Sequence, residues 1–158
     1  MKSSVRIASL DDAETITILI NSAFRIAEGF FIEEDRINLE GVQNYFTTGR
    51  FLVTAIDDIP AACVYIEPRG ERAYLGLLSV EPARQHNGLG KLLMDAAEEF
   101  CRELGCRFMD LNVVNLREEL FGFYRRRGYV ETGTSPFPAD VVTKLPCHFI
   151  DMSKLLTT

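Results

Sequence analysis

Apolar residues recur every three or four positions in several stretches of the chain, a spacing typical of amphipathic helices with one buried face. The spacing predicts helices over residues 12–27, 89–104 and 116–127. A shorter helix is expected between Leu39 and Gly49, and the glycine ends it. The apolar stripe within residues 89–104 is unbroken, and charged residues occupy the opposite face. This helix is therefore the best-patterned element of the sequence.

Stretches in which apolar residues alternate or run continuously predict the strands. Turn signals separate them, such as Asp57-Asp58 and the segment from Pro68 to Glu71. The strands expected from this pattern are residues 5–8, 51–56, 59–67, 72–80, 107–114, 129–134 and 147–152. The continuous apolar run in residues 72–80 indicates burial on both faces of that strand. Strand, helix and strand then follow one another, which predicts a right-handed parallel crossover within a mixed α/β fold.

Residues 81–90 form a short glycine-containing loop that leads from a strand into the best-patterned helix. A helix N-terminus leaves backbone N–H groups unpaired and carries a partial positive charge, so it favours a phosphate or pyrophosphate. Two familiar phosphate motifs are excluded. A Walker loop needs Ser or Thr after Gly90-Lys91, where this chain has Leu92. A dinucleotide fingerprint needs a small residue where Leu93 stands.

Composition and charge restrict the classes of partner that the chain is expected to bind. The 158 residues include 17 Lys and Arg against 23 Asp and Glu, a net charge of −6, which argues against non-specific nucleic-acid binding and suits a cationic small molecule. No apolar run approaches a membrane span and no signal-peptide pattern is present, so we expect a cytoplasmic protein without a membrane partner. The four cysteines lack a metal-binding spacing, so we expect free thiols and no metal. They are Cys63, Cys101, Cys106 and Cys147.

The loop sequence Gln85-His86-Asn87-Gly88-Leu89-Gly90 resembles the Q/R-x-x-G-x-G/A acyl-CoA-binding motif of the GNAT N-acetyltransferase superfamily. The segment from Phe123 to Tyr129 resembles the family's Y-x-x-x-G-F/Y segment, and the order of elements over residues 5–152 also matches. The resemblance implies a mixed α+β fold, with a mostly antiparallel sheet of about six to seven strands and about four helices. Residues 1–158 would form a single N-acetyltransferase domain.

The resemblance also implies a set of residues that bind acetyl-CoA. Backbone N–H groups of the loop would hold the CoA pyrophosphate, and free backbone groups of the preceding strand would pair with the pantetheine amides. The implied cofactor-binding residues are Leu78, Ser79, Val80, Gln85, His86, Asn87, Gly88, Leu89, Gly90, Lys91, Asn115 and Tyr124. One spacing departs from the family, because its asparagine usually lies seven residues before the tyrosine, where this chain has Arg117. Either the loop is longer and Asn115 still reaches CoA, or the contact is lost.

By the same resemblance, the reaction is the attack of an amine on the thioester of acetyl-CoA. Tyr124 occupies the family's general-acid position, four residues before Gly128. A phenol with a pKa of about 10 is protonated at neutral pH and can donate to the leaving thiolate. The base that deprotonates the amine is left open between Glu71, Tyr74, His148 and a water relay.

The acceptor is expected to be a primary amine of a small molecule or peptide, bound by residues 28–38 and 134–146. In the first of these loops, aromatic residues beside the acidic residues 33–35 could line a pocket for an ammonium group. The alternative is a packed loop followed by the solvated acidic first turn of a helix. A homodimer is left open. The competing function is a non-catalytic acyl-CoA-binding or sensing domain on the same fold.

Overall fold

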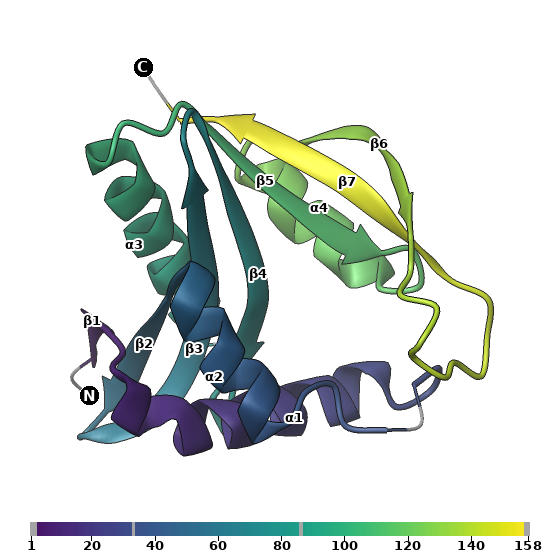
Figure 1. Cartoon of the computed structure of the whole chain (residues 1–158), viewed down its shortest axis with the longest axis horizontal. Helices are drawn as coiled ribbons and strands as arrows, with labels where there is room; N and C mark the ends of the chain where they lie inside the picture. Colours follow the sequence, from purple (N-terminus) through teal and green to yellow (C-terminus); the bar gives the residue numbers. More distant parts are fainter. Residues whose placement is uncertain (1–2, 33, 86, 157–158) are drawn as a thin grey trace.

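A single mixed sheet forms the centre of the computed structural model, which describes residues 3–32, 34–85 and 87–156 (Figure 1). Within these residues the sheet has seven strands in the order β1-β2-β3-β4-β5-β7-β6, and β4 and β5 are its only parallel neighbours. The strands are β1 Ser3–Ile7, β2 Arg50–Ile56, β3 Ile59–Arg69, β4 Arg72–Val80, β5 Phe108–Val114, β6 Val130–Pro136 and β7 His148–Leu155. The predicted parallel crossover and the mostly antiparallel sheet are confirmed.

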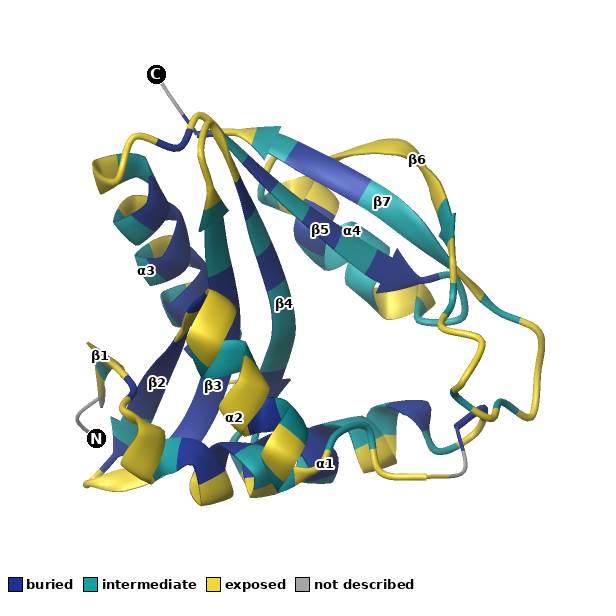
Figure 2. Cartoon of the chain, in the orientation of Figure 1, coloured by how far each residue is buried: buried dark blue, intermediate teal, exposed yellow. Residues whose placement is uncertain are grey.

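Helices cover both faces of this sheet. They are α1 Ala13–Glu28, α2 Leu39–Thr48, α3 Leu89–Glu103 and α4 Glu118–Arg126, with 3-10 turns at Leu10–Asp12 and Pro82–Arg84. The apolar sides of α1 and α2 pack on one face of the sheet, and those of α3 and α4 pack on the other. Figure 2 shows this division, since buried residues lie on the sides of α1 and α3 that face the strands. Each helix thus buries the stripe that its sequence spacing predicts.

The start of α2 tests one of the two interpretations of the acidic loop before it. Asn38 caps this helix, because its side-chain oxygen accepts a hydrogen bond from the amide of Gly41 at 2.8 Å. The acidic residues Glu34 and Asp35 therefore lie in the loop and not in the first helical turn, and that part of the prediction is wrong. Asp35 instead accepts a hydrogen bond from Arg25 of α1 at 2.7 Å.

Strand β4 bulges and then separates from β5. Cys63 pairs with Ser79 and Tyr65 pairs with Gly76, so two residues of β4 lie opposite one residue of β3. Leu77, one of the two, has a φ of +55°, an unfavourable value for a leucine. Pairing with β5 stops at Tyr74, and the two strands diverge as a V with α1 across its open end (Figure 1). The expectation that both faces of this strand are buried is therefore wrong for its second half.

An ion pair near the start of α1 makes the stability of the fold depend on pH. The carboxylate of Asp12 accepts hydrogen bonds from Arg6 at 2.8 and 2.9 Å and from the amide of Ser9 at 2.8 Å. The bonds to Arg6 lower the pKa of Asp12 to about 2. Because this pKa lies below that of an unfolded aspartate, the stabilisation is present above about pH 4 and is lost as the pH falls towards 2.

We therefore expect Asp12→Asn to lower the free energy of unfolding by about 1 kcal/mol at pH 6, a small value because Arg6 is half exposed to screening solvent. At pH 3, between the two pKa values, roughly half of this difference should have disappeared. Urea unfolding of both proteins at the two pH values measures it. An equal difference at pH 6 and pH 3 would show that the charge of Asp12 contributes nothing.

Candidate active site

An open groove of about 530 Å³ runs along the separated half of β4. Its walls are Leu78 and Val80 of β4, residues 88–91 at the start of α3, one face of α4, and residues of α1. This space is called the outer groove below. Six further predicted cofactor-binding residues line it together with Leu78, so the structure brings most of the predicted set together. They are Val80, Gln85, Gly88, Leu89, Gly90 and Lys91.

The N-terminus of α3 faces the outer groove without a side-chain cap. The first hydrogen bond of this end runs from the amide of Leu92 to the carbonyl of Gly88 at 3.0 Å, so the N–H groups of residues 89–91 have no partner within the helix. Gly88 has a φ of +77°, and a Cβ built on it would meet no atom within 4 Å. The backbone angle, and not lack of space, therefore requires glycine here.

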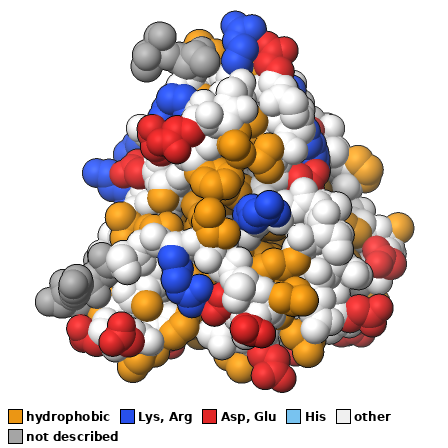
Figure 3. All heavy atoms as spheres, turned by 60° about the vertical axis from the view of Figure 1, so that its left-hand side comes forward, with side chains coloured by type: hydrophobic (Ala, Val, Ile, Leu, Met, Phe, Trp, Pro, Cys, Tyr) orange, Lys and Arg blue, Asp and Glu red, His pale blue; other side chains and the backbone are white. Residues whose placement is uncertain are grey.

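The charged residues of the outer groove favour an anion. Lys91, Arg117 and Arg126 line it against one acidic residue, Glu119, although the whole chain has a net charge of −6. On the face shown in Figure 3, basic and acidic side chains are interspersed around hydrophobic ones. The excess of two positive charges beside an uncapped helix N-terminus is thus a local feature, and it suits a phosphate group.

The segment at α4 supplies groove residues that the sequence pattern did not predict. Arg117 directly before α4 and then Leu120, Phe123 and Arg126 follow one another at every third position, so each lies beside the next on the helix surface. A Cβ on Gly90 would lie 3.8 Å from the ring of Phe123, so the helices approach each other closely here. The three-residue spacing could have indicated a groove-lining face. Because the same spacing also forms the apolar stripe that predicts the helix, the two could not be told apart in the sequence.

A second space lies deeper between β4 and β5 and shares Phe24, Leu78, Arg117 and Leu120 with the outer groove. This inner pocket has a volume of about 120 Å³ and contains Tyr124 in its wall. Its other polar residues are Glu28, Arg36, Tyr45, Tyr65, Tyr74, Asn112 and Arg117. Residues of the two spaces thus form one continuous lining.

Tyr124 is almost completely buried, with 6% of its surface exposed. Burial raises the pKa of its hydroxyl to about 12, although Arg117 acts in the opposite direction. Tyr74, another candidate from the sequence, lines the same pocket and donates a hydrogen bond to Asn112 at 3.3 Å. Burial also raises the pKa of Tyr74. Both phenols are therefore protonated at neutral pH.

Several predicted residues do not contribute side chains to these spaces. Ser79 is buried, and its hydroxyl donates to the carbonyl of Leu77 at 3.0 Å, so it offers only backbone groups. Asn87 is exposed in the loop and does not line the groove. Asn115 accepts a hydrogen bond from the amide of His148 at 2.9 Å, and its contact with CoA stays a prediction. His86 lies outside the described residues.

Two of the candidate bases lie away from the inner pocket. Glu71 occupies the turn before β4 and forms an ion pair with Arg107 at 2.6 Å. It precedes Leu77 by six residues, which is about 20 Å along an extended strand. His148 is exposed at the start of β7 and does not line the pocket.

The two loops expected to bind the acceptor lie against each other. The amide of Lys144 donates to the carbonyl of Phe31 at 2.7 Å, and its ammonium donates to the carbonyl of Gly29 at 3.1 Å. Phe31 and Val114 form a small apolar cluster with residues of the second loop and of β7. Both loops therefore adjoin the C-terminal end of α1, where Glu28 reaches the inner pocket.

Within the described residues, no group of three or more His, Cys, Asp or Glu side chains could hold a metal ion. All four cysteines are free thiols, as expected, and three of them are buried. None of the described helices has the length and apolarity needed to cross a membrane. The cytoplasmic location and the homodimer stay predictions.

Comparisons with known proteins agree on one family. The sequence model of the Acetyltransferase (GNAT) family matches residues 17–129. No curated protein matches the chain. PaiA N-acetyltransferase from Thermoplasma acidophilum, solved in complex with coenzyme A, has a TM-score of 0.80 and 20% identity over 98% of this chain and 99% of its own. Ard1 from Thermoplasma volcanium has a TM-score of 0.82 and 18% identity over 100% of both chains.

The ribosomal-protein-S18-alanine N-acetyltransferase from Escherichia coli has a TM-score of 0.79 and 14% identity over 99% of this chain and 96% of its own. At these identities the structural likeness shows only the fold. The family model matches well over half of the sequence, which is enough to assign the family. On this ground the chain belongs to the GNAT acetyltransferase family.

Proposed function

We propose that the protein is an N-acetyltransferase that transfers the acetyl group of acetyl-CoA to a primary amine of a small molecule or peptide. The observation that carries this proposal is the separation of β4 from β5 beside an uncapped helix N-terminus. A free strand edge, a cradle of N–H groups and a buried tyrosine then lie along one continuous lining. PaiA N-acetyltransferase, a structural neighbour, was solved with coenzyme A.

The outer groove fits the polar part of CoA. The N–H groups of residues 89–91 and the ammonium of Lys91 would hold the pyrophosphate, because donors and positive charge converge there. Arg126 lies on the opposite wall and would contribute further positive charge. The free edge of β4 around Leu78 and Val80 would pair with the amide groups of pantetheine, as an added strand would. A CoA molecule bound in this way would place its thioester in the inner pocket.

In the proposed reaction, the nitrogen of the neutral amine attacks the carbonyl carbon of the thioester and forms the new C–N bond. The C–S bond breaks, and its electron pair passes to sulfur. The hydroxyl of Tyr124 would donate its proton to the sulfur, and the tyrosinate would regain one from the nitrogen through solvent. Its raised pKa keeps the hydroxyl protonated before the reaction starts.

Among the candidate bases predicted from the sequence, positions and pKa directions favour a water relay for the first proton of the ammonium. Glu71 is paired with Arg107 in a distant turn, and His148 lies outside the pocket. Tyr74 lies in the pocket, but its raised pKa keeps its hydroxyl protonated at neutral pH, so it is not available as a base.

Two measurements test the proposal. Isothermal titration with acetyl-CoA should show one binding site, and a panel of primary amines should release the CoA thiol in an amine-dependent manner with a product heavier by one acetyl group. Binding of acetyl-CoA without turnover across a broad panel would favour the sensing domain instead. If nucleotides bind and CoA does not, the proposed role of the outer groove is refuted.

A further inference from the structure

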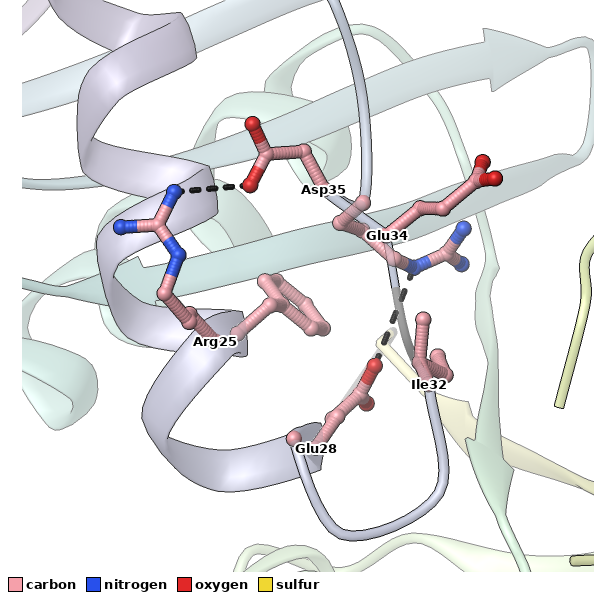
Figure 4. A pocket seen from close by; sticks show the side chains of 8 residues that line it. Arg25, Glu28, Ile32, Glu34 and Asp35 are labelled. Atoms are coloured by element: carbon pink, nitrogen blue, oxygen red, sulfur yellow. Dashed lines mark hydrogen bonds and ion pairs between the residues drawn. The ribbon is translucent and has the colours of Figure 1, made fainter. Parts of the chain in front are cut away.

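A buried carboxylate at the end of α1 is only partly paired. The side chain of Glu28 is 4% exposed, and its Oε2 accepts a hydrogen bond from Arg117 at 3.1 Å. Its Oε1 has no hydrogen-bond partner among the described residues. The Nε of Arg36 lies 4.0 Å from this oxygen and is likewise buried and without a partner. In Figure 4, Glu28 points from the helix along the dashed line that marks its ion pair.

This arrangement leaves a donor and an acceptor facing each other across a gap. Buried polar groups without hydrogen bonds are unfavourable, so they are rare unless a ligand or water completes them. The guanidinium of Arg36 lies over the rings of Phe24 and Phe137, at 5.7 and 5.9 Å from their centroids. These aromatic contacts restrict the orientation of the Arg36 side chain, although its Nε–H donates no hydrogen bond to the described residues. A ligand that both donates and accepts would satisfy both groups at once.

Glu28 and Arg36 connect two spaces. Both residues line the inner pocket that contains Tyr124, and both line a depression between the end of α1 and residues 34–36. The labelled residues of Figure 4 surround this depression. Neither residue lines the outer groove. An acceptor bound by this pair would therefore approach Tyr124 from a side that CoA does not occupy.

The charges of the inner pocket favour a ligand without net charge. Apart from tyrosines, its ionisable residues are Glu28, Arg36 and Arg117. Glu119 forms an ion pair with Arg117 at 2.7 Å, and its charge also acts on Glu28, so two carboxylates balance the two arginines. A simple alkylammonium would add an unbalanced positive charge, whereas a zwitterionic ligand would not.

We propose that Glu28 and Arg36 bind the acceptor, and that the acceptor is a small α-amino acid. Its amino group donates to Oε1 of Glu28, and its carboxylate accepts from Nε of Arg36. The volume of the inner pocket, about 120 Å³, limits the size of the side chain. This proposal rests on the proposed acetyltransferase function, because it assigns the acceptor of that same site. A peptide amino terminus offers a carbonyl oxygen in place of the carboxylate and adds a positive charge that the pocket does not balance.

The test compares ligands that differ only in the carboxylate. The twenty amino acids are screened with acetyl-CoA, and the best one is compared with its amide and with the corresponding decarboxylated amine. We expect the amide and the amine to lose at least tenfold in kcat/KM, mainly through KM, which is the scale of one charge-assisted hydrogen bond. Equal or better turnover of the amide would overturn the proposal and favour a peptide acceptor.

Substitutions identify the residues responsible. Arg36→Met should lower kcat/KM for the amino acid at least tenfold and leave that for the decarboxylated amine within about twofold. Glu28→Gln should raise KM for both. Arg107→Met and Glu71→Gln are matched controls, since they remove an exposed ion pair far from the pocket. If Arg36→Met does not fold, Arg36→Lys, which keeps the charge without the Nε–H, should show a smaller loss in the same direction.

A binding measurement separates this proposal from the proposed function. Amino acids are titrated calorimetrically into the protein saturated with CoA. Binding that Arg36→Met weakens, without turnover of any amine, would support the binding pair and contradict the acetyltransferase activity. Turnover of amines with no preference for amino acids would support the activity and overturn the binding pair.

Discussion

Replacing Tyr124 with phenylalanine is expected to lower kcat for acetyl transfer about 100-fold, within the range for loss of a general acid. The Kd for acetyl-CoA should stay within about twofold, because the hydroxyl is proposed to interact with sulfur as charge develops on it. The hydroxyl of Tyr124 makes no hydrogen bond with the described residues, so its removal should hardly change the free energy of unfolding. Steady-state kinetics, calorimetry and urea unfolding measure the three quantities.

Tyr129 provides the matched control for this substitution. Its ring lies 5.8 Å from that of Tyr124, and it is also buried, but its hydroxyl donates to Glu98 at 3.0 Å and it does not line the pocket. Tyr129→Phe should therefore lower the free energy of unfolding by about 1–2 kcal/mol and leave kcat almost unchanged. An unchanged kcat for Tyr124→Phe would remove its role as an acid.

The second large effect is expected at the start of α3. Gly88→Val should weaken acetyl-CoA binding about 100-fold, because a β-branched residue disfavours the φ of +77° and the backbone N–H groups then lose their common direction. The Cβ itself would meet open space, so steric conflict within the protein is not the cause. Calorimetric titration with acetyl-CoA measures the change.

Gly70→Val separates local strain from the loss of the binding site. Gly70 has a φ of +73° and also meets no atom within 4 Å, but it lies in the turn between β3 and β4 and not in the groove. Both variants should lose similar stability, about 1–2 kcal/mol. Acetyl-CoA affinity should be lost only with Gly88→Val, and retained affinity would place the pyrophosphate elsewhere.

Much of the fold could be predicted because its signals are local. The apolar stripes of α1 and α3 follow the helical period within one segment, and their helices formed as expected. Residues 88–91 could be predicted as an anion site for the same reason, since a helix N-terminus and a glycine with positive φ depend on a few neighbouring residues. The order of strands and helices then limited the sheet to a small number of topologies.

Other features of the site depend on residues that are distant in the sequence. The apolar run of β4 predicted a fully buried strand, but its pairing with β3 places a bulge at Leu77 and its separation from β5 opens the groove. Asn115 matched a family position only approximately, and its side chain oxygen already accepts from His148.

The sequence by itself determined the elements, the family resemblance and the candidate phosphate-binding loop, because each is encoded in periodicity or in contiguous residues. Only the tertiary structure decided which charges act together. Glu28, Arg36 and Arg117 come from α1, the loop after it and the segment before α4, and in the sequence they look like ordinary surface charges. In the fold these side chains are buried together and lose their contacts with water. Oε1 of Glu28 and Nε of Arg36 are left without hydrogen-bond partners, and these two atoms are the basis for the proposed amino-acid acceptor.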